Sequence, residues 1–169
     1  MLICASGGFG SGKSTLRPYL TERLPGVLVV DMDELLEDGR LVGVLIADEA
    51  ASADWPAYNR LWARILQFGL RSGHSVVFLT PCLPDEFPTP EPAQWLLLDC
   101  ADEEREIRLR GRGWGPEQIA DAVQDARNAR SKISTVIRTD DGDLAATADA
   151  VAGWIGRQVA ADRRDVRQA

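Results

Sequence analysis

The sequence has few of the residues that mark metal, disulfide or membrane proteins. Its 169 residues include 1 histidine and 3 cysteines, and it has no long apolar stretch. Cys4, Cys82 and Cys100 are far apart and lie in or beside apolar runs. They form neither a CxxC pair nor a metal pattern, and they suit buried positions in a reducing compartment. Without a Ser/His/Asp set or a His/Cys cluster, hydrolysis by a nucleophile or by zinc has no basis here.

Basic residues are outnumbered by acidic ones. The chain has 19 Lys and Arg against 26 Asp and Glu, a formal net charge of −7, which argues against a general nucleic-acid partner. The opening MLICASGG lacks the basic segment of a signal peptide, and no run is long enough for a membrane span. We therefore expect a cytoplasmic protein without nucleic-acid or membrane partners, one domain by length, and a monomer or homodimer.

Glycine is concentrated near the start of the chain. Residues 7–14 read GGFGSGKS, which fits the Walker A pattern of a glycine, four residues, then Gly12, Lys13 and Ser14. An apolar run precedes this string and a helical segment follows it, the context that makes it a phosphate site rather than an ordinary glycine turn. Backbone N–H groups can turn inward on a triphosphate, Lys13 can reach the β- and γ-phosphates, and the Ser14 hydroxyl can ligate Mg²⁺. The predicted nucleotide-binding residues are Gly8, Phe9, Gly10, Ser11, Gly12, Lys13, Ser14 and Thr15.

Short apolar runs alternate with helical segments along the whole chain. Continuous apolar runs indicate strands covered on both faces, and hence a parallel sheet. The strands are expected at 2–5, 27–30, 75–80, 95–98 and 135–138. The helices are expected at 14–24, 54–72, 102–111, 116–130 and 144–159. The pattern predicts one α/β doubly wound domain over 1–161 and a polar tail over 162–169, with the ligand beyond the carboxyl ends of the strands.

Two carboxylates follow the second apolar run. If the chain is still extended there, Asp31 and Asp33 point to the same side, toward the glycine loop. Mg²⁺ prefers oxygen ligands, and a carboxylate farther out can accept a proton from an attacking hydroxyl. We therefore assign Asp31, with Ser14, to the metal and Asp33 to the acceptor, as base or orienting group. The alternative is that both acids cap the next short helix.

Arginines gather after the fourth apolar run, in the segment EREIRLRGRGWG and the helix beyond it. Phosphoryl transfer spreads negative charge over oxygen atoms, and mobile arginines can neutralise that charge and exclude water. We expect a lid over about 105–132, with Arg108, Arg112 and Arg130 as leading contacts. Together with Lys13 and Asp33 they form the predicted catalytic set. The alternative is a solvated helix face whose arginines pair with glutamates at i, i+4.

Three of these motifs together resemble the nucleoside/nucleotide-kinase-like branch of P-loop proteins: GGFGSGKS, the DMD after the second run and the RLRGRGW segment. Within that branch the chain is most similar to small bacterial kinase-like ATPases of the tunicamycin-resistance type, with chloramphenicol phosphotransferase and shikimate kinase as more distant relatives. The resemblance implies a three-layer fold, with a five-stranded parallel sheet and helices on both faces. It also implies ATP and Mg²⁺ as cofactors. In shikimate-kinase-like members the first Asp of such a DxD assists the metal and the second meets the acceptor, which agrees with our assignment.

The resemblance further implies transfer of the γ-phosphate to a hydroxyl or phosphate of a small acceptor, a nucleoside, a nucleotide or an antibiotic. The acceptor region would span about 32–73. There the aromatic residues Trp55, Tyr58 and Trp62 could sandwich a ring, and Arg60 and Arg64 could bind an anion. The alternative is that Tyr58 and Trp62 lie in the core and the two arginines in solvent. The third run ends in Leu79-Thr80-Pro81 without the Walker B acid of many P-loop proteins. A nucleotide-binding switch or weak ATPase without transfer therefore remains the alternative.

Overall fold

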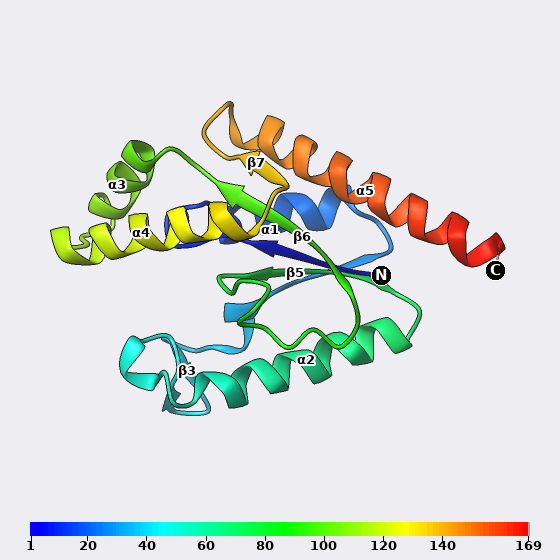
Figure 1. The fold of residues 1–169 in the computed structure, drawn as a ribbon, viewed down its shortest axis with the longest axis horizontal. Coiled ribbons are helices and arrows are strands. Elements are labelled where there is room, and N and C mark those ends of the chain that lie inside the picture. Colours follow the sequence, from blue (N-terminus) through cyan, green and yellow to red (C-terminus); the bar gives the residue numbers. More distant parts are fainter. Residues whose placement is uncertain (169) are drawn as a thin grey trace.

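Five parallel strands form the central sheet of the molecule (Figure 1). The computed structural model describes residues 1–168, with side chains except at position 49 and beyond 164. The strands of the sheet are Leu2–Ser6 (β1), Val27–Asp31 (β2), Ser75–Thr80 (β5), Ala93–Asp99 (β6) and Val136–Arg138 (β7). They pair in the order β2-β5-β1-β6-β7. These are the five predicted strands, shifted at their ends by two residues at most, and the predicted fold class is confirmed.

Helices cover both faces of this sheet (Figure 1). The α-helices within residues 1–168 are Lys13–Arg23 (α1), Trp55–Arg71 (α2), Asp102–Arg110 (α3), Pro116–Lys132 (α4) and Leu144–Gln168 (α5). None of these helices combines the length and the apolar character needed to cross a bilayer. The predicted end of the last helix at 159 was wrong. The segment after it contains alanine, arginine and glutamine, which favour helix, and α5 continues to Gln168. Position 169 lies outside the described residues.

Alternation along the central strand β1 explains the two layers. Ile3 and Ala5 point into a cluster formed with α1 and α5, whereas Leu2 and Cys4 point into a second cluster formed with α2. A strand buried on both faces is apolar on both sides along most of its length. This is why residues 2–5 form one continuous apolar run, and the buried Ser6 that ends β1 donates its hydroxyl to the Cys82 carbonyl oxygen.

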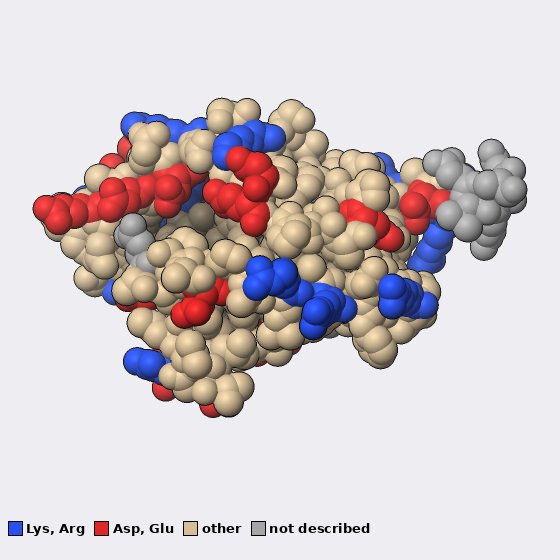
Figure 2. Space-filling view, turned by 60° about the horizontal axis from the view of Figure 1, so that its bottom comes forward, with Lys and Arg blue, Asp and Glu red and all other residues tan. Residues whose placement is uncertain are grey.

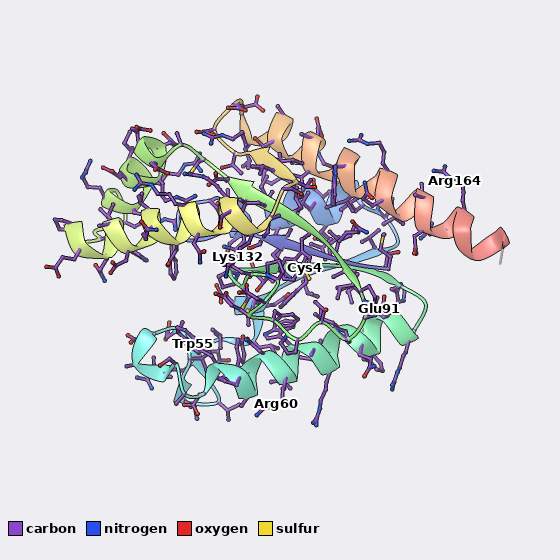
Figure 3. All side chains as sticks on the ribbon, viewed as in Figure 1. Cys4, Trp55, Arg60, Glu91, Lys132 and Arg164 are labelled. Carbon is purple, nitrogen blue, oxygen red and sulfur yellow. The ribbon has the colours of Figure 1, made fainter. Side chains whose placement is uncertain are left out.

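Helix α2 buries one stripe and leaves the opposite side in water. Tyr58, Trp62 and Leu66 recur at intervals of four and are buried against the sheet, the spacing of one helical face. Arg60 points away from the sheet (Figure 3), and Arg64 is also exposed. Tyr58 and Trp62 therefore lie in the core, and Arg60 and Arg64 lie in solvent.

The segment between β2 and α2 contains structure that the sequence did not predict. Two short strands, Arg40–Leu41 (β3) and Val44–Leu45 (β4), form an antiparallel hairpin. Its turn residues Val42 and Gly43 have φ of +49° and +82°, the left-handed conformations of a type I′ turn. Strands of two residues are too short to show a period, and Val-Gly is not a usual signal for this turn. Two short 3₁₀ helices, Met32–Leu35 (η1) and Glu49–Ala51 (η2), flank the hairpin.

Two helical glycines test how tightly the helices lie on the sheet. A Cβ at Gly156 of α5 would meet nothing within 4 Å, whereas a Cβ at Gly69 of α2 would lie 3.0 Å from Leu28 Cδ2 and 3.1 Å from Val76 Cγ2. Gly156→Ala should raise the free energy of unfolding by about 0.5–1 kcal/mol. Gly69→Ala should lower it by about 1 kcal/mol, because overpacking offsets the gain in helix propensity. Urea unfolding measures both changes, and an equal gain at the two positions would contradict the close contact of α2 with the sheet.

Candidate functional site

The glycine loop lies between the end of β1 and the start of α1, and its backbone needs glycine at particular places. Gly10 and Gly12 have φ of +77° and +88°, in the left-handed region that side chains disfavour. A Cβ at Gly7 would lie 2.6 Å from Ser11 Oγ and 2.7 Å from the Leu98 carbonyl oxygen. Close packing thus requires Gly7, and backbone conformation requires the other two.

The first turn of α1 opens from this loop. Its N-cap is Gly12, which offers no side-chain acceptor, and the first turn contains no acidic residue. The first N–H groups of a helix have no partner within the helix, and the positive end of the helix dipole lies beside them. Such an end suits an anion, above all a phosphate group. Ser14 and Thr15 of this turn are exposed to solvent.

Lys13 connects the loop with the carboxylates after β2. Its Nζ donates a hydrogen bond to the Gly7 carbonyl oxygen. The pKa of Lys13 is lowered to about 8, mainly by burial and to a smaller extent by the positive charge of Arg105, while the negative charges of Asp31 and Asp33 oppose this change. A phosphate bound here would stabilise the protonated lysine.

Asp31 caps the next short helix, which is the alternative that the sequence left open, and it also contacts Ser14. It ends β2 and is buried, and its Oδ2 accepts a hydrogen bond from Ser14 Oγ at 3.2 Å. Its Oδ1 accepts from the Asp33 amide at 3.1 Å, while its own amide donates to Glu34 Oε2 at 3.3 Å. The second pair of bonds is a capping box that starts η1.

The neighbouring oxygens of Ser14 and Asp31 suit Mg²⁺. This ion takes oxygen ligands in an octahedral arrangement, keeps several waters and commonly shares phosphate oxygens with a bound nucleotide. The described residues contain no group of three or more His, Cys, Asp or Glu side chains that could enclose a metal. The hydroxyl of Ser14 and the carboxylate of Asp31 are oxygen donors of the kind that Mg²⁺ takes, so these two residues fit the ion.

Asp33 lies beyond the end of β2, two residues after Asp31. The strand ends at Asp31, so Asp33 belongs to η1 instead of continuing an extended strand as the sequence suggested. Its side chain is exposed, but the atoms packed around its carboxylate raise its pKa, and the charge of Asp31 raises it further against the opposing effect of Lys13. A carboxylate of raised pKa beside a phosphate site is a stronger proton acceptor than an ordinary one.

The three arginines expected in the lid occupy different environments. Arg108 lies against the glycine loop, where its Nη1 donates to the Gly10 carbonyl oxygen at 3.0 Å. Arg130 of α4 bonds to Asp99 Oδ2 at 2.6 Å and to the Cys100 carbonyl oxygen at 3.0 Å. Arg112 follows the end of α3, and its side chain is exposed. Their contact with a transferred phosphate stays a prediction, which for Arg130 requires it to leave Asp99.

Two buried charges at the site were missed by sequence reasoning. Arg105 is 0% exposed, its Nη2 bonds to Asp99 Oδ1 at 2.6 Å and its Nη1 donates to the Phe9 carbonyl oxygen. Asp99 itself is 2% exposed. One signal in the sequence could have indicated Asp99: a carboxylate directly follows the apolar run WLLL, at the edge of the sheet where ligands bind.

The lobe formed by α3 and α4 touches the glycine loop a second time. The rings of Phe9 and Trp114 lie 4.8 Å apart between centroids, and Phe9 is 55% exposed. The lobe has a small apolar cluster of its own around Leu109, Ile119 and Ala122. Figure 2 shows the surface hollowed beside this lobe, with acidic side chains along the border.

A glycine loop of this conformation, after the central strand of a β2-β5-β1-β6-β7 sheet, defines a P-loop protein of the kinase-like class. The family model described as an AAA domain matches residues 3–133, and the chain belongs to this family. No curated protein matches the sequence.

Solved structures share the fold over nearly the whole chain. The tunicamycin resistance protein of Deinococcus radiodurans is 20% identical with a TM-score of 0.66, and the match covers 92% of this chain and 95% of that one. A sugar kinase from Janibacter is 16% identical with a TM-score of 0.59 and coverages of 92% and 94%. The shikimate kinase of Aquifex aeolicus is 17% identical with a TM-score of 0.56 and coverages of 96% and 98%. These likenesses confirm the P-loop kinase fold.

The two carboxylates after β2 should differ in their effect on stability. Asp31→Ala removes the cap of η1 and the partner of Ser14, and should lower the free energy of unfolding by about 1–2 kcal/mol. Asp33→Asn should leave it unchanged or slightly higher at pH 7, because the raised pKa of Asp33 means that the fold disfavours its ionised form. Urea unfolding at pH 7 compares them. An equal loss at both positions would contradict the separate roles.

Proposed function

We propose that the protein is a Mg²⁺- and ATP-dependent kinase that transfers the γ-phosphate to a hydroxyl or phosphate of a small acceptor. The observation that carries the proposal is the grouping of Lys13, the Ser14–Asp31 pair and Asp33 at the open end of α1. Cationic, metal-holding and proton-accepting groups thereby surround one anion site. The names of the similar structures, a sugar kinase and a shikimate kinase among them, support the same class of reaction.

Nucleotide binding would use the backbone of the loop and the start of α1. The N–H groups there would hold the β- and γ-phosphates, and Lys13 would turn from the Gly7 carbonyl oxygen to a phosphate oxygen. Ser14 and Asp31 would hold Mg²⁺, which when bound supplies positive charge to the β- and γ-oxygens. These residues thus orient the γ-phosphorus for attack and neutralise its oxygens.

The acceptor would enter from the side of Asp33. The hydroxyl oxygen of the acceptor would form the new bond to the γ-phosphorus, and the proton of that hydroxyl would pass to the Asp33 carboxylate. The bond between the γ-phosphorus and the β–γ bridging oxygen would break and release ADP. A phosphate acceptor has no proton to lose, and Asp33 would then orient a neighbouring group. Arg112, between Gly111 and Gly113, can swing toward the transferred group with its exposed side chain. The acceptor would be a nucleoside, a nucleotide or an antibiotic.

One observation favours a second candidate, a nucleotide-binding switch or weak ATPase without transfer. At the end of β5 the side chain is that of Thr80, which is buried and donates its hydrogen bond to Met32 Sδ at 3.2 Å. No acid therefore extends from this strand toward the metal. ATP consumption that stays slow with every acceptor offered would favour this candidate.

Asp33→Asn tests the kinase directly. The substitution keeps the shape of the side chain but removes the proton acceptor, so transfer to an acceptor found by screening a small-molecule library should fall about 10²–10⁴-fold. Affinity for ATP, measured by calorimetry with Mg²⁺ present, should change less than about twofold, because Asp33 does not touch the phosphate site in this scheme. Glu37→Gln, an exposed acid of the same segment, is the matched control. Undiminished transfer by Asp33→Asn would remove Asp33 from the mechanism.

The pKa of Lys13 predicts how ATP affinity depends on pH. In the free protein Lys13 loses its proton near pH 8, and the bound triphosphate favours the protonated form. Affinity should therefore be constant below pH 8 and should fall by about tenfold per pH unit above it, until the pKa of the complex is reached. Calorimetry from pH 7 to 9.5 measures this, with Lys13→Arg as the variant whose charge does not titrate. Wild-type affinity that stays flat across this range would contradict the role of the lysine.

A further inference from the structure

Two arginines of α3 hold the carbonyl oxygens of consecutive residues in the glycine loop. Arg105 Nη1 donates to the oxygen of Phe9, and Arg108 Nη1 donates to the oxygen of Gly10 at 3.0 Å. Both contacts span more than 90 residues of sequence. They join the backbone of the loop to the helix expected to serve as a lid.

Holding a carbonyl oxygen also determines where the next N–H points. In a trans peptide the C=O and the N–H point in opposite directions, and the described chain has no cis peptide bond. The Phe9 carbonyl held outward therefore turns the Gly10 N–H inward, to the side where a phosphate would lie. The Gly10 carbonyl likewise orients the Ser11 N–H, which bonds to the Gly8 oxygen at 3.2 Å and closes the loop.

The two arginines belong to a closed ring of hydrogen bonds. Arg105 Nη2 bonds to Asp99 Oδ1 at 2.6 Å, and the Asp99 carbonyl oxygen accepts from the Thr139 amide at 2.7 Å. Arg108 then donates to the Thr139 carbonyl oxygen at 3.0 Å and to its hydroxyl at 3.1 Å. The ring thus runs from the loop through Arg105, Asp99, Thr139 and Arg108 back to the loop. It spans the ends of β1, β6 and β7.

Stability alone is a weak reason to bury these charges. Removing a carboxylate and a guanidinium from water carries a large desolvation penalty for each ion, and apolar residues of similar volume often stabilise a core equally well. Arg105 Nε is moreover buried without a hydrogen-bond partner. What the ion pair does provide is a fixed direction for the guanidinium that holds the Phe9 carbonyl.

We propose that Asp99, Arg105 and Arg108 are positioning residues that keep the glycine loop in its phosphate-binding conformation before a nucleotide arrives. This rests on the proposed nucleotide binding, because a loop ordered beforehand loses less entropy when the triphosphate binds. It also changes the role expected for Arg108, from a contact with phosphate to a support of the backbone around it. Lid movement would then begin after α3, in the glycine-rich turn at 111–115.

Charge-preserving variants test the proposal. Arg105→Lys and Arg108→Lys keep the positive charge but lose the planar fork that reaches two acceptors at once. Each should weaken binding of Mg²⁺–ADP and of a non-hydrolysable Mg²⁺–ATP analogue by about tenfold, as measured by calorimetry. In the transfer assay the KM for ATP should rise by a similar factor, with kcat and the KM for the acceptor within about twofold. Arg110→Lys is the matched control, since Arg110 is exposed and pairs with Glu106 of the same helix at 3.5 Å.

The outcomes separate this proposal from the proposed function. Wild-type affinity in Arg108→Lys, or a loss of affinity no larger than in Arg110→Lys, overturns the positioning role while leaving nucleotide binding intact. A loss that only parallels a lower urea midpoint also overturns it, because the residues would then be merely structural. Arg108 is partly exposed, so this variant should fold even if Arg105→Lys does not. Weaker nucleotide binding by the variants supports the proposal even if no acceptor is phosphorylated, and a wild-type protein that binds no nucleotide overturns both.

Discussion

The conformation of one short stretch of backbone, the loop from Gly7 to Gly12, is the constraint on which the other features depend. Left-handed torsions at Gly10 and Gly12 turn the chain sharply between β1 and α1, and carbonyl oxygens that face outward leave N–H groups facing inward. Such a turn loses conformational entropy when it is ordered. The sheet behind the loop, α1 beyond it and the arginines of α3 beside it share in holding it.

The buried carboxylate of Asp99 neutralises the charge of the arginines that lie beside the glycine loop. Its carboxylate meets Arg105 at 2.6 Å and Arg130 at 2.6 Å, with Arg138 at 3.8 Å. The buried carboxylate of Asp99 thus fixes the positions of the guanidinium groups of Arg105 and Arg130, with Arg138 nearby. The network connects β6, β7, α3 and α4 to the glycine loop, so helices α3 and α4 are attached to the site by hydrogen bonds and not only by the turn between them.

Local signals explain which parts of the site could be predicted. The spacing of Gly12, Lys13 and Ser14 after an apolar run indicates a P-loop, because strand, turn and helix are all encoded within about a dozen residues. Asp31 and Asp33 were likewise placed at the correct edge of the sheet. The extended chain that would align them on one side was not found, because β2 ends at Asp31, which caps η1, and Asp33 belongs to η1. The β3–β4 hairpin was missed since each of its strands has only two residues.

The sequence by itself determined the fold class, the five strands and the place where a phosphate would bind, because hydrophobic periodicity and glycine spacing are local properties. Only the tertiary structure decided what the charged residues of the second half do. Arg105 and Arg108 look alike in the sequence, yet one is buried on Asp99 and the other bridges Gly10 and Thr139. Asp99, Thr139 and Gly10 lie between 6 and 98 residues from the arginine that each of them contacts, and only folding brings these groups within hydrogen-bonding distance.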